Sequence, residues 1–195
     1  YMGQAPAEIN ISGTITGETM GLDITAYERL ELKAQDLDDE KAYDLVDELW
    51  DAGTQTITLH HSEDYIERSA PLVAPSAKGL ITVYVCSGEE LDFRAGSYGG
   101  HNAFREWLCR LASIPEPRTQ WAAPEKYAGL PFFELVNFSD CEGVIGADAA
   151  AELAKDFAVY QAQANAANDE WFTPLYAKWR RAFEIASKGG CVQFH

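Results

Sequence analysis

The sequence predicts an α+β fold, in which a small and mainly antiparallel β-sheet is covered by three or four helices in a single domain. Three observations support this. Apolar and polar residues alternate through much of the first half, apolar residues at helical spacing fill the last third, and a strand-like segment comes at the end. Without an internal repeat, 195 residues suit one domain. We place it at residues 20–195 and regard residues 1–19 as an N-terminal extension, a processed segment or a fusion remnant.

The first half supplies most of the sheet. Alternation predicts strands over residues 22–32 and 56–60. Between them, residues 36–51 predict an amphipathic helix that ends before Gly53, with carboxylates on its outer side. Its buried side is expected to hold the apolar residues Ala42, Leu45, Val46, Leu49 and Trp50.

The middle of the chain predicts a hairpin, a helix and a loop. Residues 80–86 and 91–94 form two β-rich runs around a Ser87-Gly88 turn signal, which favours an antiparallel hairpin. A helix over residues 104–111 follows, with Asn102 as its N-cap. Residues 114–131 carry four prolines and are expected to be an irregular loop.

The last third predicts two helices and an edge strand. Asp148 is placed as the N-cap of a helix that ends near residues 165–168, and Thr173, followed by Pro174, as the N-cap of the next. The second helix ends at Gly189-Gly190. The last residues, 192–194, are expected to close the sheet at one edge.

The chain is strongly acidic, with a net charge of -16 and a sequence pI of about 4.5. Nucleic-acid binding is therefore not expected, because phosphate backbones need cationic partners. Residues 1–70 hold 16 acidic and 4 basic side chains, so the acidity is concentrated in the N-terminal half. The acidic outer side of the helix over residues 36–51 is expected to be a solvated face that confers solubility. The alternative is that it is a surface that binds a basic protein partner.

Composition also bears on compartment and metals. No apolar run approaches the length that spans a bilayer, and we expect a cytoplasmic protein without a membrane segment. Cys86, Cys109, Cys141 and Cys191 lack zinc-site spacing, so no metal or cofactor is expected. The four cysteines are expected to be reduced thiols, with two disulfides left open as the alternative.

A glycine-rich junction is the first candidate site. Residues 93–105 run from a strand through Gly96, Gly99 and Gly100 into a helix, and such a junction offers free N–H groups to an anion. The side chains expected to bind the ligand there are Arg94, Ser97, His101, Asn102 and Arg105. The alternative is that the glycines only permit a tight turn and close packing.

A second stretch, residues 137–146, is expected to form the other wall of the site through Asp140 and Glu142. Its spacing imitates part of a calcium loop, but Phe138 and Ala149 stand where the strongest ligands belong. Cys141 lies between two carboxylates, which disfavour a thiolate nucleophile. A packed turn before a helix is the alternative interpretation.

Several motifs resemble one family. They are the opening MGLDITAY at residues 20–27, FRAGSY at 93–98, FSDCEG at 138–143, WRRAF at 179–183 and GCVQFH at 190–195. On these motifs the chain is similar to an uncharacterised family of small proteins carried by phages, prophages and their bacterial hosts. The resemblance implies an accessory role in such a cell, and it implies no activity, cofactor or catalytic residue.

Two functions follow as hypotheses. The first is a non-enzymatic interaction protein, a phage-borne modulator of a host process, that uses its acidic N-terminal half. The second is a small enzyme or ligand-binding protein that acts on a phosphate- or carboxylate-bearing molecule at Gly96–Arg105. The second requires a concave pocket where the two candidate stretches converge.

Overall fold

The computed structural model describes residues 21–60, 70–139 and 142–195 and confirms the α+β class. Five strands form one sheet in the order β2-β3-β1-β5-β4, and every neighbouring pair is antiparallel. The strands are β1 (Leu22–Leu37), β2 (Thr56–His60), β3 (Ile81–Gly96), β4 (Gly143–Gly146) and β5 (Cys191–Phe194).

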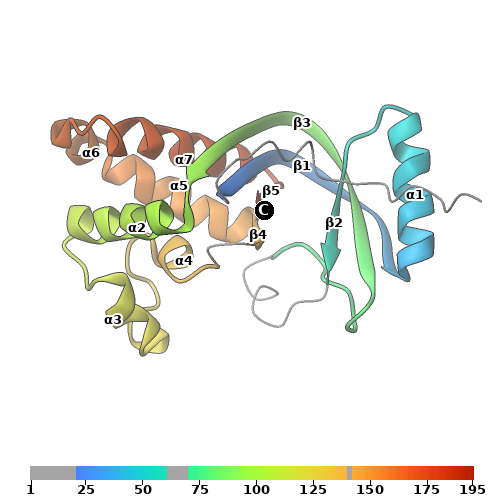
Figure 1. Ribbon diagram of the computed structural model, residues 1–195, viewed down its shortest axis with the longest axis horizontal. Helices are drawn as coiled ribbons and strands as arrows, with labels where there is room; N and C mark the ends of the chain where they lie inside the picture. Colours follow the sequence, from blue (N-terminus) through green and yellow to red (C-terminus); the bar gives the residue numbers. More distant parts are fainter. Residues whose placement is uncertain (1–20, 61–69, 140–141) are drawn as a thin grey trace, which may run out of the picture.

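The helices gather at opposite ends of the sheet. Figure 1 shows α2, α5, α6 and α7 at one end and α1 alone at the other. The four longest helices are α1 (Asp39–Asp51), α2 (Tyr98–Ala112), α5 (Ala147–Val159) and α7 (Phe172–Ala186). They correspond to the predicted ones. Shorter additions in the described residues are α3 (Pro117–Trp121), η1 (Pro124–Lys126), α4 (Phe133–Val136) and α6 (Gln161–Ala167).

The predicted hairpin at residues 80–94 is wrong. β3 is one continuous strand of 16 residues that pairs with β1 along its length. The turn signal marks a β-bulge instead, where the register shifts between the pairs Tyr27–Glu90 and Arg29–Ser87. Gly88 has φ +102° in this bulge, a backbone conformation that favours glycine.

The C-terminal strand β5 was predicted at an edge of the sheet, but it lies between β1 and β4. Its Phe194 pairs with Ile24 on one side and with Gly143 on the other. The edge strand β4 lies where a turn was expected. Gly190, which precedes β5, passes so close to β1 that an added Cβ would overlap the carbonyl group of Tyr27.

The ends of the last helices differ from the prediction. Helix α5 begins after Gly146, so Asp148 lies in its first turn rather than at the cap. Helix α7 begins at Phe172 with Trp171 at its N-cap position, so Thr173 lies inside the helix rather than at the cap. The carboxylate of Asp169 accepts the N–H of Phe172 at 2.7 Å just before the helix. The proline-rich stretch 114–131 is not wholly irregular, because it contains α3 and η1.

The apolar interior divides into one large core and two small ones. The large core lies between the sheet and the helices α2, α5 and α7, and its centre is the fully buried Trp179, whose ring packs against Phe93 and Phe183. A small cluster under α1 has only Ala42, Ile81 and Val83 as buried members. None of the described helices has the length and apolar character needed to cross a membrane.

Candidate functional site

The glycine-rich junction is a capped helix start. The hydroxyl of Ser97 accepts the N–H of Gly100 at 3.1 Å, so helix α2 begins at Tyr98 and Asn102 lies inside it rather than at its cap. Gly99 and Gly100 belong to the first helical turn. The expected glycine-rich loop is therefore reduced to Gly96, whose φ of +106° makes the turn out of β3.

Arg105 connects the two predicted walls from the inside of the protein. Its side chain is 2 % exposed, and Nη2 donates to the carbonyl oxygens of Phe138 at 2.6 Å and Ser139 at 2.8 Å. Nη1 donates to the side-chain oxygen of Asn102 at 3.0 Å. The guanidinium thus holds the backbone that precedes residue 140 against α2.

His101 is a core residue. It is fully buried, and its ring packs against Trp179 at a centroid distance of 5.4 Å and against Phe194 at 6.2 Å. Neither ring nitrogen has a hydrogen-bond partner among the described residues. Burial, and then the nearby charge of Arg105, hold the pKa of His101 well below its ordinary value, so the ring is neutral at pH 7.

Arg94 and Glu142 lie at the surface of the same region. Nη1 of Arg94 is 3.9 Å from a carboxylate oxygen of Asp23, and its guanidinium packs over Gly21. Glu142 is exposed, while Asp140 and Cys141 lie outside the described residues. Anion binding at this junction stays a prediction, and the geometry does not favour it, because His101 and Arg105 face the interior.

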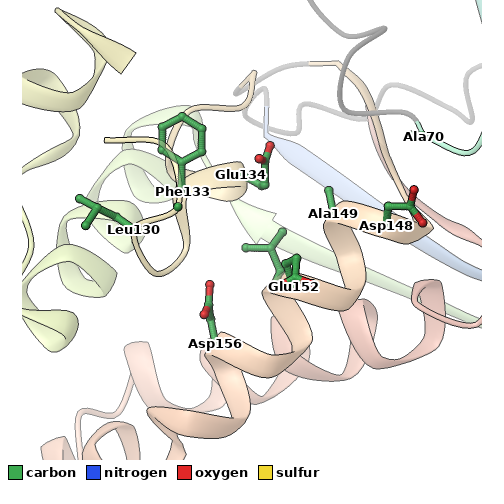
Figure 2. A pocket seen from close by; sticks show the side chains of 10 residues that line it. Ala70, Leu130, Phe133, Glu134, Asp148, Ala149, Glu152 and Asp156 are labelled. Atoms are coloured by element: carbon green, nitrogen blue, oxygen red, sulfur yellow. The ribbon is translucent and has the colours of Figure 1, made fainter. Parts of the chain in front are cut away.

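A pocket lies elsewhere, between α4 and α5, and it is acidic. It has a volume of about 410 Å³ and is lined by Ala70, Gly129, Leu130, Phe133, Glu134, Asp148, Ala149, Glu152, Leu153 and Asp156. Figure 2 shows Asp148, Glu152 and Asp156 on successive turns of α5, with Glu134 across from them on α4. The sequence patterns do not predict this pocket. The four-residue spacing of Asp148, Glu152 and Asp156 can be read from the sequence. The packing of α4 against α5, which forms the opposite wall of the pocket, cannot.

The environment of Asp156 indicates the charge that this pocket accepts. Its carboxylate accepts the backbone N–H of Phe132 at 2.7 Å, while burial and the neighbouring Glu152 raise its pKa. Glu152 forms an exposed ion pair with Lys155 at 2.7 Å, a weak interaction in water. No cluster of three metal-ligating side chains occurs among the described residues. The pocket lining thus combines four carboxylates with apolar side chains.

The outer face of α1 is the other charged surface. We define the α1 outer face as the acidic row Glu40, Asp44, Asp47 and Asp51 with the neighbouring aromatic residues Tyr43 and Trp50. Trp50 is 73 % exposed and Tyr43 is 52 % exposed. The prediction that Trp50 packs inside is wrong, because Ala42, Leu45, Val46 and Leu49 alone turn toward the sheet.

Part of the charge on α1 opposes the helix dipole. Asp38 caps its start by accepting the N–H of Lys41 at 3.0 Å, and the acids of the first turn are favourable there. The last turn carries Glu48 and Asp51 and has no basic residue, although the end of a helix favours cations. A positive partner would offset this unfavourable placement.

The thiols of the described residues are structural. Cys86, Cys109 and Cys191 are free, as expected from the sequence. Burial raises the pKa of Cys86 and of Cys109 to about 12, and that of Cys191 well above its ordinary value. A thiol with such a pKa is protonated at pH 7, so none of these three suits a nucleophile.

The chain matches no family model, and the searches of curated proteins and of solved structures return no match.

Proposed function

We propose that this protein is a non-enzymatic interaction protein that binds a basic protein partner through the acidic N-terminal half of the chain. One observation carries the proposal: the side chain of Trp50 is 73 % exposed in the last turn of α1, beside the row of carboxylates on that helix. Exposed Trp and Tyr residues are enriched among the side chains that dominate binding energy at interfaces.

The chemistry of the α1 outer face favours a cationic partner. Surface carboxylates steer a basic protein toward the helix. The aromatic rings provide apolar surface whose burial in the interface is favourable. Both kinds of group are needed, because charge alone gives weak, salt-screened attraction. The same helix carries acids in its last turn that a bound cation would compensate.

The resemblance to phage- and prophage-borne proteins suggests where the partner is found. We propose that it is a host protein in the bacterial cytoplasm and that binding modulates a host process. This part of the proposal comes from the resemblance, and the charge of -16 supports only the basic character of the partner.

The test compares proteins retained from a bacterial lysate by the wild-type chain and by Trp50→Ala. A matched control is Val159→Ala, which removes a 67 % exposed apolar side chain at the end of α5, outside α1. A basic protein that binds the wild-type chain and the control, and that loses at least tenfold in affinity for Trp50→Ala, supports the proposal. Partners that bind all three alike contradict it.

A second candidate function is the binding of a linear aliphatic polyamine in the α4–α5 pocket. Four residues of helix rise by about 6 Å, so the carboxylates of Asp148, Glu152 and Asp156 follow one another at that axial interval. Amines joined by three or four methylene groups are also about 5 to 6 Å apart. Leu130, Phe133 and Leu153 offer apolar contact to those methylenes.

Calorimetry with a linear triamine tests this second candidate. Asp156→Asn should weaken binding at least tenfold, whereas Glu106→Gln, an exposed change on α2, should leave it unchanged. Equal affinity of both variants for the triamine would show unspecific electrostatic attraction. Binding of magnesium as strong as that of the triamine, at the same concentration of positive charge, would show the same. The same instrument tests the predicted anion site by titration with phosphate and nucleotides.

A further inference from the structure

We infer that the partner of the α1 outer face is a basic amphipathic α-helix, with Lys or Arg along one side and apolar residues seven positions apart beside them. This inference rests on the proposed function and adds the shape of the partner to it. The proposed function requires only a basic protein, which could also present a loop, a strand or a disordered tail.

The spacing of the aromatic residues indicates a helical partner. Tyr43 and Trp50 are seven residues apart, so they lie on one side of α1 about 10 Å from each other along its axis. A helix that packs alongside repeats its own side chains over the same two-turn interval. Two apolar residues seven positions apart therefore contact both aromatic rings at once.

The acidic row supplies the charge complement of such a helix. Glu40, Asp44, Asp47 and Asp51 follow at intervals of four, three and four residues, which forms one continuous stripe along α1. The stripe runs beside the aromatic pair, so a partner needs its basic residues adjacent to its apolar ones. A guanidinium that reaches the ring of Trp50 gains a cation–π contact in addition.

Other occupants fit this face less well. Nucleic acid and anionic lipid surfaces are repelled by its carboxylates. A second copy of this chain would bring a like-charged stripe and a further net charge of -16. The partner is therefore a basic segment of a different protein.

The position of α1 separates this surface from the pocket. In Figure 1, α1 packs on the end of the sheet opposite to α5 and α7. Ala42 is the buried residue of α1 and forms a cluster with Ile81 and Val83. Substitutions on the α1 outer face leave this cluster intact. Binding at the two acidic places can be distinguished by mutation.

The experiment measures the binding of a labelled synthetic helix of about 18 residues, long enough to cover α1, by fluorescence anisotropy. Its sequence places Leu seven positions apart and Arg beside them, and a scrambled peptide of the same composition is the comparison. We expect the wild-type chain to bind the amphipathic peptide at least tenfold tighter than the scrambled one. Trp50→Ala and the triple variant Asp44→Asn, Asp47→Asn, Asp51→Asn should each remove this preference.

Two controls keep the result specific. Glu106→Gln with Glu125→Gln and Glu170→Gln removes three exposed carboxylates outside α1 and should preserve the preference. Circular dichroism confirms that the variants stay folded, as expected for an exposed side chain such as Trp50.

Several outcomes would overturn the inference. Equal affinity for the two peptides, an unchanged preference in Trp50→Ala, or loss of binding in Asp156→Asn instead would each do so. Self-association of the wild-type chain that Trp50→Ala abolishes would identify a second copy as the occupant. If the peptide shows no preference while a basic lysate protein still depends on Trp50, the helical partner is wrong and the proposed function stands.

Discussion

Replacing Arg105 by Ala should destabilise the protein strongly, without any ligand being present. The side chain is 2 % exposed, and its hydrogen bonds to described residues include those to Phe138, Ser139 and Asn102 at 2.6, 2.8 and 3.0 Å. Its removal leaves the buried carbonyl oxygen of Phe138 and the partly buried one of Ser139 without this donor, and it opens a cavity beside α2. A buried polar group left without its partner costs about 1 to 3 kcal/mol, and the cavity adds to this, so we expect a total loss of about 3 kcal/mol.

The assay is urea denaturation followed by circular dichroism, together with a thermal melt. A loss of that size corresponds to a fall of about 10 °C in the midpoint for a domain of this length. Arg105→Lys keeps the charge but not the planar fork, so it should lose part of the stability. Arg110→Ala is the matched control, since Arg110 lies on the exposed side of α2 over the ring of Trp107.

The alternative to be excluded is that Arg105 serves a ligand. If Arg105→Ala lowers the unfolding free energy by less than about 1 kcal/mol, the buried hydrogen bonds do not have the structural importance assigned to them. If phosphate stabilises the wild-type chain and this response disappears in Arg105→Ala, the anion site predicted from the sequence is supported instead.

The remaining predictions concern a histidine, two glycines and two thiols. The unfolding free energy should fall by up to about 1.4 kcal/mol per pH unit below pH 6.5. The reason is that His101 binds a proton in the unfolded chain but stays neutral in the folded one, where its pKa is lowered. Urea denaturation of His101→Leu at several pH values should lack this contribution to the slope. Gly99→Ala should stabilise α2 by up to about 1 kcal/mol, since its Cβ would meet only a serine oxygen at 3.9 Å, whereas Gly96→Ala, at φ +106°, should destabilise by about that amount; thermal melts that show the same sign for both would contradict the assigned helix start. The pKa values of the half-buried Cys86 and the buried Cys109 are both raised to about 12, so at pH 8 both thiols should react with a thiol reagent much more slowly in the native chain than after unfolding; rapid native labelling of Cys109 would refute its burial.

The elements that sequence patterns predicted best are those with many periodic residues. The four long helices and the strands over β1 and β2 follow from apolar spacing alone. The prediction of a hairpin was wrong because a glycine at position 88 is compatible with both a turn and a β-bulge. A positive φ suits both a turn and a β-bulge, and only the pairing of β1 with the whole of β3 decides between them. The four residues of β4 are too few to show a period.

The candidate site was mispredicted for a related reason. With Asn102 as the N-cap, His101 fell outside the helix and was available to a ligand. With Ser97 as the N-cap, residues 101, 104, 105 and 108 form one helical face, and all four are buried. The burial of a histidine and an arginine on that face still required tertiary context, because the acceptors for Arg105 come from residues 138 and 139.

The uneven division of the apolar core has a consequence for cooperativity. The body around Trp179 contains most of the buried side chains, whereas α1 rests on a cluster with three buried members. Local opening therefore costs less at the α1 end, and its amides should exchange with solvent sooner than those of α7. A partner that binds only the ordered helix would slow this exchange, so association and local folding would be thermodynamically linked at that end of the sheet.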